Sequence, residues 1–87
     1  MKKTITLTVA EKEFSFDINT NDYNDFINGV TESNKVQPSF VLLNRTIDAE
    51  QKEDLKKLIE DHPNATAQMA GMLIQEFAPA IEISVKK

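Results

Sequence analysis

The sequence contains no cysteine, a single histidine (His62) and a single arginine (Arg45). The absence of cysteine excludes a disulfide framework and a thiolate metal site, and it fits a reducing compartment. With so few histidine and arginine side chains, the usual nucleophile, metal-ligand and phosphate-clamp arrangements lack components. We therefore predict a protein without enzymatic activity, without a catalytic residue, and without a metal or cofactor site.

Long apolar runs are also absent, since no window approaches the 18 apolar residues of a membrane-spanning helix. Met1-Lys2-Lys3 resembles the start of a signal peptide, but Glu11, Lys12 and Glu13 end the apolar run that follows far too early. We expect a soluble, cytoplasmic protein with no membrane partner.

Basic charge is scarce in the body of the chain. Between Thr4 and Val85 there are 6 basic residues against 14 acidic ones, a net charge of −8. This balance argues against nucleic-acid binding through phosphate neutralisation and favours a basic protein partner. A chain of 87 residues predicts one domain, residues 1–87, of a size at which homo-oligomerisation or a partner often completes the burial of apolar surface.

Three segments show the two-residue period of a half-buried strand. The first two predict a hairpin that turns near Ala10 to Lys12, where the absence of Asn-Gly or Asp-Gly leaves room for a loop of more than two residues. The third predicts a C-terminal strand added to that hairpin. The alternating apolar residues are Ile5, Leu7 and Val9, then Phe14, Phe16 and Ile18, and finally Ile81, Ile83 and Val85.

Four helices are predicted between the hairpin and the last strand. Thr20 or Asn21 can cap the first, whose apolar face carries Tyr23, Phe26, Ile27 and Val30. Pro38 suits the first position of the second helix, and the spacing around it predicts a buried ridge of Val36, Phe40, Leu43 and Ile47; a strand over 40–43 is the alternative.

The third helix begins at a capping-box pattern, Asp48 with Gln51, and its inward stripe is Leu55, Leu58 and Ile59. His62-Pro63 ends it, and the last helix starts at Asn64 and stops before Pro79. The fold class is therefore α+β, a small antiparallel sheet of the N-terminal hairpin plus the C-terminal strand, packed against about four helices.

The last helix is the most informative segment for function. Its face of Met69, Met72, Leu73 and Phe77 is typical either of a hydrophobic core or of an adaptable docking surface for another protein. Few positions of this helix are polar, so its apolar stripe is wider than one sheet covers. We predict these four residues as the partner-binding residues.

Two other features have simple structural interpretations. His62 stands at the end of a helix, where an imidazole usually caps carbonyl groups rather than acting as a base. The acidic clusters, Glu50, Glu53 and Asp54 and then Glu60 and Asp61, fall on a solvated helix face and lack the glycine-containing loop of a Ca²⁺ site.

The order and character of several segments resemble those of the small tail assembly chaperones of phages and prophages. The resemblance runs nearly end to end and contains no catalytic signature. Its parts are Ile5-Thr6-Leu7-Thr8-Val9 with Glu13-Phe14-Ser15-Phe16-Asp17-Ile18, then Asp22-Tyr23-Asn24-Asp25-Phe26-Ile27-Asn28, Asn34-Lys35-Val36-Gln37-Pro38 and Gln75-Glu76-Phe77-Ala78-Pro79-Ala80-Ile81-Glu82-Ile83.

The resemblance implies a non-enzymatic protein that keeps the tape-measure protein soluble while tail-tube subunits polymerise, with the tape-measure or tail-tube protein as partner. The alternative is an acidic interaction or inhibitor protein of a mobile element, acting as a nucleic-acid mimic or host-factor binder. Such mimicry requires carboxylates arrayed over one face, whereas here Lys52, Lys56 and Lys57 are interleaved with them.

Overall fold

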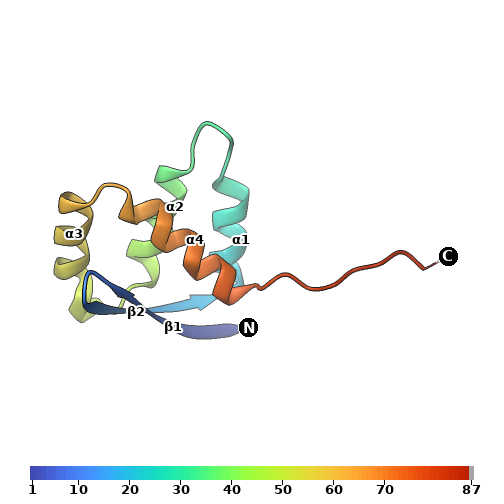
Figure 1. The fold of residues 1–87 in the computed structure, drawn as a ribbon, viewed down its shortest axis with the longest axis horizontal. Coiled ribbons are helices and arrows are strands. Elements are labelled where there is room, and N and C mark those ends of the chain that lie inside the picture. Colours follow the sequence, from blue (N-terminus) through green and yellow to red (C-terminus); the bar gives the residue numbers. More distant parts are fainter. Residues whose placement is uncertain (87) are drawn as a thin grey trace.

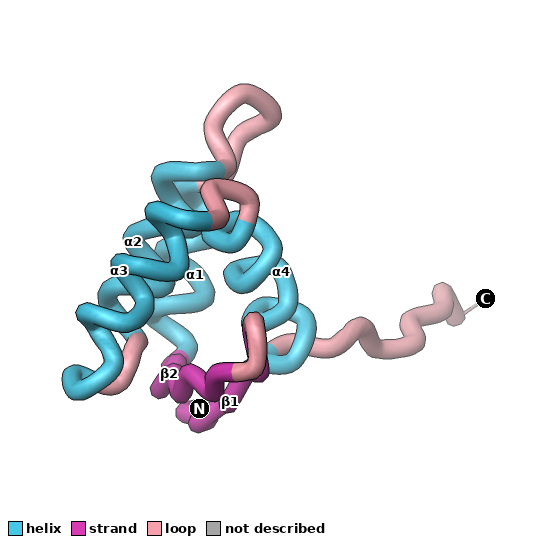
Figure 2. The backbone as a smooth tube through the Cα atoms, turned by 60° about the vertical axis from the view of Figure 1, so that its left-hand side comes forward, coloured by secondary structure: helices cyan, strands magenta, loops and turns pink. Residues whose placement is uncertain are grey.

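A computed structural model describes residues 1–86. A β-hairpin forms one layer, and four helices pack on one side of it (Figures 1 and 2). This arrangement confirms the predicted α+β class. The elements are β1 (Lys2–Val9), β2 (Lys12–Asn19), α1 (Thr20–Gly29), α2 (Val36–Thr46), a 3-10 turn (Ala49–Gln51), α3 (Lys52–Asp61) and α4 (Ala65–Phe77).

The hairpin turns through two residues, Ala10 and Glu11, and not through a longer loop. Both have positive φ, 50° and 67°, the combination that a two-residue type I′ turn requires. For residues other than glycine this conformation costs roughly 1–2 kcal/mol each. The turn forms nevertheless, because its twist matches that of the two strands, which pair over eight positions from Lys2 with Asn19 to Val9 with Lys12.

The core lies between the hairpin and the helices. Strand β2 supplies three of its six largest fully buried side chains, and the matching side chains of β1 are only partly buried. On α3, Leu55 is buried and Leu58 and Ile59 are partly buried, which confirms the predicted inward stripe. The buried apolar cluster consists of Phe14, Phe16, Ile18, Leu43, Ile47, Leu55, Ala65, Met69, Leu73 and Phe77.

The first helix is capped one residue earlier than predicted. Asn19, and not Thr20 or Asn21, accepts a hydrogen bond from the backbone N–H of Asp22, and the Asp22 carboxylate accepts one from the N–H of Asn19, both at 2.9 Å. This reciprocal pair is a capping box in which aspartate replaces the usual glutamate. The last residue of β2 therefore also starts α1.

Two of the four residues predicted to form a buried ridge on α2 are exposed. The segment is a helix, as predicted, and not a strand, and Leu43 and Ile47 are buried. Val36 and Phe40, however, are exposed, because the buried face of α2 is rotated and carries polar as well as apolar residues. The buried residues of this helix are Ser39, Leu42, Leu43 and Thr46.

The predicted capping box of Asp48 and Gln51 is also wrong. Asp48 Oδ1 accepts from the N–H of Glu50 (3.0 Å) and so caps the 3-10 turn, whereas the Gln51 side chain turns back to the hairpin. There it donates to the carbonyl oxygen of Glu13 (2.9 Å) and accepts from the N–H of Ser15 (2.8 Å). The side-chain amide of Gln51 therefore bonds to the backbone of β2 and does not cap the start of the helix.

The C-terminal strand does not form. Beyond Phe77 the chain is extended and runs away from the body, where it has no strand beside it among residues 1–86 (Figure 1). Ile81, Ile83 and Val85 are 77%, 80% and 82% exposed. Alternation alone does not make a strand, because the backbone N–H and C=O groups need a partner edge.

Candidate functional site

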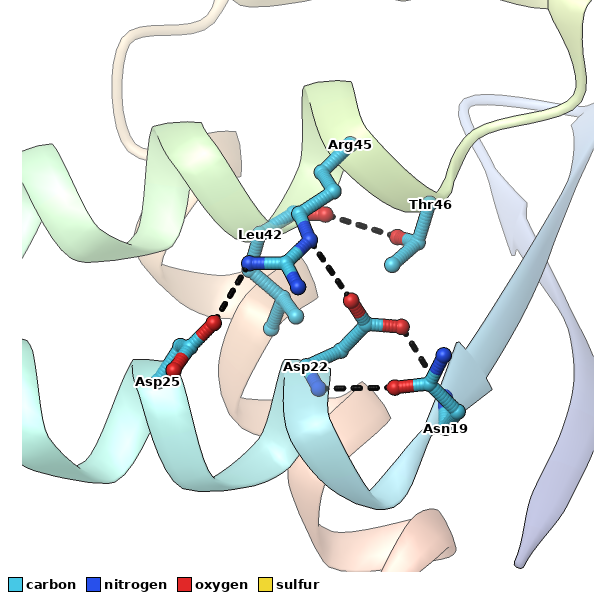
Figure 3. A network of polar contacts seen from close by, with 6 residues as sticks. All are labelled: Asn19, Asp22, Asp25, Leu42, Arg45 and Thr46. Carbon is cyan, nitrogen blue, oxygen red and sulfur yellow. Dashed lines mark hydrogen bonds and ion pairs between the residues drawn. The ribbon is translucent and has the colours of Figure 1, made fainter.

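Helices α1 and α2 are fixed to each other by a buried carboxylate. Asp22 is almost fully buried and uses both of its oxygens: one accepts from the N–H of Asn19 and the other lies 2.7 Å from Nε of Arg45 (Figure 3). A second carboxylate, that of Asp25, accepts from Nη1 of the same guanidinium at 2.7 Å. The only arginine of the chain is therefore used to join two helices.

The surroundings of Arg45 keep it positively charged. The hydrogen bond that Arg45 donates to Asp25, followed by the charge of Asp22, raises the pKa of Arg45 above its ordinary value. The next residue of α2, Thr46, donates its hydroxyl to the carbonyl oxygen of Leu42 one turn earlier (2.7 Å), so this buried polar group is also paired. The interior side of α2 is thus a rigid support for the side that faces outward.

The outward side of α2 carries three exposed apolar side chains beside the polar residues Gln37 and Asn44. Val36, Phe40 and Val41 are 64%, 44% and 46% exposed. We call these three residues the α2 face. Exposed apolar side chains that share one helix are a common feature of protein-binding surfaces.

A hollow lies on each side of the α2 face. The hollow between α1 and α2 has a volume of about 310 Å³ and includes Phe26, Pro38 and Val41 in its lining. The hollow between α2 and α3 has about 340 Å³ and includes Phe40, Ile59 and Lys56. A helix laid across α2 could insert side chains into both hollows, the way ridges pack into grooves.

The four residues predicted to bind a partner do not lie together on the surface. Met69, Leu73 and Phe77 are buried in the core, where the Phe77 ring stacks on Tyr23 with centroids 5.8 Å apart. Met72 is 50% exposed. In this conformation only Met72 is available to another molecule, and the assignment of the set to partner binding stays a prediction.

Met72 lines a groove between α4 and β1, with a volume of about 410 Å³. We call it the edge groove, because it lies beside β1, which among residues 1–86 pairs with β2 alone. Gln68 and Glu76 of α4 add polar groups to the wall that Met72 forms. Along the strand, the lining residues are Ile5, Thr6, Leu7, Thr8 and Val9.

The opposite edge of the hairpin is covered. Phe16 of β2 forms an isolated bridge with Ile47, and the carbonyl oxygen of Ser15 accepts from the N–H of Asp48 at 2.9 Å. The Gln51 amide satisfies the N–H of Ser15 and the carbonyl of Glu13. The connection after α2 therefore occupies the hydrogen-bonding positions of β2.

The pairing also identifies the groups that β1 leaves open. In an antiparallel hairpin closed by two residues, the flanking pair, Val9 with Lys12, exchanges its hydrogen bonds, and bonded pairs then alternate along the strands. Thr4, Thr6 and Thr8 consequently direct their N–H and C=O groups outward. Ser15, which pairs with Thr6, likewise directs its N–H and C=O away from β1, and they bond to Gln51 and Asp48.

The remaining candidates have structural positions. His62 is exposed and ends α3, with its backbone N–H on the carbonyl oxygen of Leu58 at 2.8 Å. Asp54 of the acidic cluster lies 3.9 Å from the Lys12 ammonium. Among residues 1–86 no three histidine or acidic side chains are grouped as a metal site would need. None of the described helices is long and apolar enough to cross a membrane.

The α2 face and the free edge of β1 were not predicted from the sequence, for two different reasons. Val36 and Phe40 have the spacing of a buried ridge. However, the hydroxyls of Ser39 and Thr46 donate to backbone carbonyl groups four residues earlier, so these two residues can be buried in place of Val36 and Phe40. The free edge of β1 was missed because the alternating residues Ile81, Ile83 and Val85 predicted a third strand paired with the hairpin. Nothing in the alternating pattern distinguishes a strand with a partner from one without.

Comparison with known proteins agrees with the resemblance noted above. Residues 5–87 match the phage tail assembly chaperone family. The chain is 35% identical over 86 residues to a protein of Haemophilus phage HP1 (strain HP1c1) that is named "Uncharacterized 11.3 kDa protein in lys 3'region", with 99% of this chain and 83% of the phage protein covered. No solved structure matches the chain significantly. The chain belongs to the phage tail assembly chaperone family.

Proposed function

We propose that this protein binds the tape-measure protein and keeps it soluble during tail morphogenesis, without catalysing a reaction. Family membership supports a role in tail assembly. The observation that carries the choice of a long helical client is the α2 face between its two hollows. Exposed apolar side chains flanked by two hollows suit the apolar face of an amphipathic helix.

The construction of α2 fits this role. Its inner side is held by Leu42, Leu43 and the Asp22–Arg45 contact, so Val36, Phe40 and Val41 are presented on a rigid support. A partner that covers them removes apolar surface from water without first ordering a loop. Charged groups, among them Asp25 and Lys56, stand around the hollows and supply a polar rim.

Co-expression with the tape-measure protein of the same phage tests the proposal. The wild-type chain should raise the soluble fraction of the client several-fold. The double variant F40Q/V41Q should lose this effect, because a helical but polar residue replaces each apolar contact. Ile27→Gln is the matched control: Ile27 is similarly exposed, at 47%, on α1, and it lines neither hollow.

Circular dichroism of each variant establishes that the fold is intact. If the tape-measure protein precipitates equally with and without the wild-type chain, the proposed function is wrong. If F40Q/V41Q solubilises the client as well as Ile27→Gln does, the client contact does not lie on the α2 face.

A further inference from the structure

The tail after α4 has the alternating sequence of a strand but forms none in residues 1–86. In an extended conformation this alternation puts Ile81, Ile83 and Val85 on one face and Glu82 and Ser84 on the other. These three side chains are the most exposed large apolar groups of the described chain. A segment of this kind gains most by adding to a free sheet edge.

The edge groove has the complementary features. Its floor is the free edge of β1, where Thr4, Thr6 and Thr8 offer unpaired backbone groups. A strand added there in register places one face beside Ile5, Leu7 and Met72, and the other beside the exposed threonine side chains. The apolar face of the tail fits the first environment, and Glu82 and Ser84 fit the second.

We infer that the edge groove receives the C-terminal tail of a second copy of this chain. Within one chain the tail leaves α4 beside the start of β1, because Lys3 Nζ donates to the carbonyl oxygens of Glu76 and Phe77 at 3.2 Å. It would have to reverse at once to run along β1. Pro79 disfavours a helical conformation at Ala78, whose φ and ψ are −131° and 71°, and the tail points away from the body (Figures 1 and 2).

Each chain carries one tail and one edge groove, so in a pair of chains the tail of each copy can lie in the edge groove of the other. That arrangement closes with twofold symmetry and leaves neither a free tail nor a free β1 edge. The solution species is therefore a dimer, of about twice the 9.8 kDa mass of one chain. The inference is independent of the tape-measure proposal, because its test uses this protein alone.

Disulfide trapping tests the contact directly, since the wild-type chain has no cysteine. Separately purified Thr6→Cys and Ser84→Cys proteins are mixed under mild oxidation, and a second mixture pairs Thr6→Cys with Glu82→Cys. Residues on the same face of neighbouring strands come within disulfide reach. At least one mixture should give a covalent heterodimer. Ile83→Cys is the matched control, because its side chain faces the other side of the sheet and should not couple to Thr6→Cys.

Analytical ultracentrifugation gives the second readout. The wild-type protein should sediment as a dimer, Ser84→Ala should be unchanged, and Ile83→Asp and Met72→Asp should each shift to the monomer mass with unchanged circular dichroism. Because a mixture of the two aspartate variants contains one intact tail and one intact groove, it should regain part of the dimer.

Three results would overturn the inference. One is a monomeric wild-type protein at all concentrations up to the millimolar range. Another is rapid closure of the double variant T6C/S84C or T6C/E82C within single chains, which would place the tail on its own β1. The third is a dimer that persists unchanged in both Ile83→Asp and Met72→Asp.

Discussion

The two edges of the hairpin are equal in length and paired to each other in one register, but the chain treats them differently. At the β2 edge, Ser15 bonds through its N–H to Gln51 and through its carbonyl to Asp48. At the β1 edge, Thr6 directs the same two groups into a groove. An edge closed within the chain belongs to the folded domain, and an open edge of eight residues is a binding site for a strand.

Burial follows the same division. Phe14, Phe16 and Ile18 of β2 are essentially fully buried, whereas Ile5 and Leu7 of β1 are only partly covered. The covered edge thus coincides with the strand that builds the core. The open edge coincides with the strand whose apolar side chains still have area to bury.

The largest expected effect comes from removing a core side chain at the closed edge. Phe16→Ala should destabilise the fold by about 3–5 kcal/mol, because a fully buried ring leaves a cavity that its neighbours cannot fill. Leu7→Ala, on the open strand, should cost clearly less. Urea unfolding of both variants measures the difference, and equal losses would show that the two strands contribute equally to the core.

Proline substitutions at facing positions compare the edges themselves. Thr6 and Ser15 are directly opposite in the register. Ser15→Pro should cost roughly 2–3 kcal/mol, since it removes the N–H that Gln51 accepts from, and Thr6→Pro should cost under about 1 kcal/mol. Both changes are made in the Ile83→Asp background, so that a second copy does not contribute. A cost at Thr6 as large as that at Ser15 would contradict an open β1 edge.

Opening the closed edge should have a smaller effect. Gln51→Ala removes two hydrogen bonds to β2 and should destabilise the protein by about 1–2 kcal/mol, with faster amide exchange at Ser15. Gln75→Ala, on the exposed side of α4, is the control and should stay within about 0.5 kcal/mol of wild type. If exchange at Ser15 is unaffected by Gln51→Ala, the covering of this edge does not depend on the amide.

The smallest expected change in stability comes from a substitution in α4, the helix that lines the edge groove. Gly71 lies within α4 with open space where a Cβ would stand, so Gly71→Ala should stabilise the fold by about 0.5–1 kcal/mol. Because this change does not touch the β1 edge, the dimer should sediment as before. Thermal unfolding and sedimentation separate the two, and a weakened dimer would mean that α4 must bend to admit the tail.

Much of the fold could be predicted from the sequence. The periodicity of Phe14, Phe16 and Ile18 identified a strand, and His62-Pro63 and Pro79 marked two helix ends that the structure confirms. These features are local, and neighbouring residues determine them. The Gln51 contact to β2 could not be predicted in this way, because it joins residues 36 and 38 positions apart.

The candidate surfaces were harder to predict than the fold. Met69, Met72 and Phe77 share one stripe in the sequence, yet two are core and one, Met72, is half exposed in the edge groove. Likewise, Ile83 has the same pattern whether its strand pairs or stays free. Which of these occurs depends on tertiary and quaternary contacts that a pattern does not contain.

Residue-specific amide hydrogen exchange at Thr6 and Ser15, followed over a wide range of protein concentration, tests the central claim most directly. The N–H of Ser15 should be protected equally at every concentration, because the chain itself covers it. The N–H of Thr6 should exchange rapidly in dilute protein and in Ile83→Asp, and become protected as the wild-type protein is concentrated. Protection of Thr6 that is independent of concentration, or exchange of Thr6 that stays rapid throughout, would contradict the account.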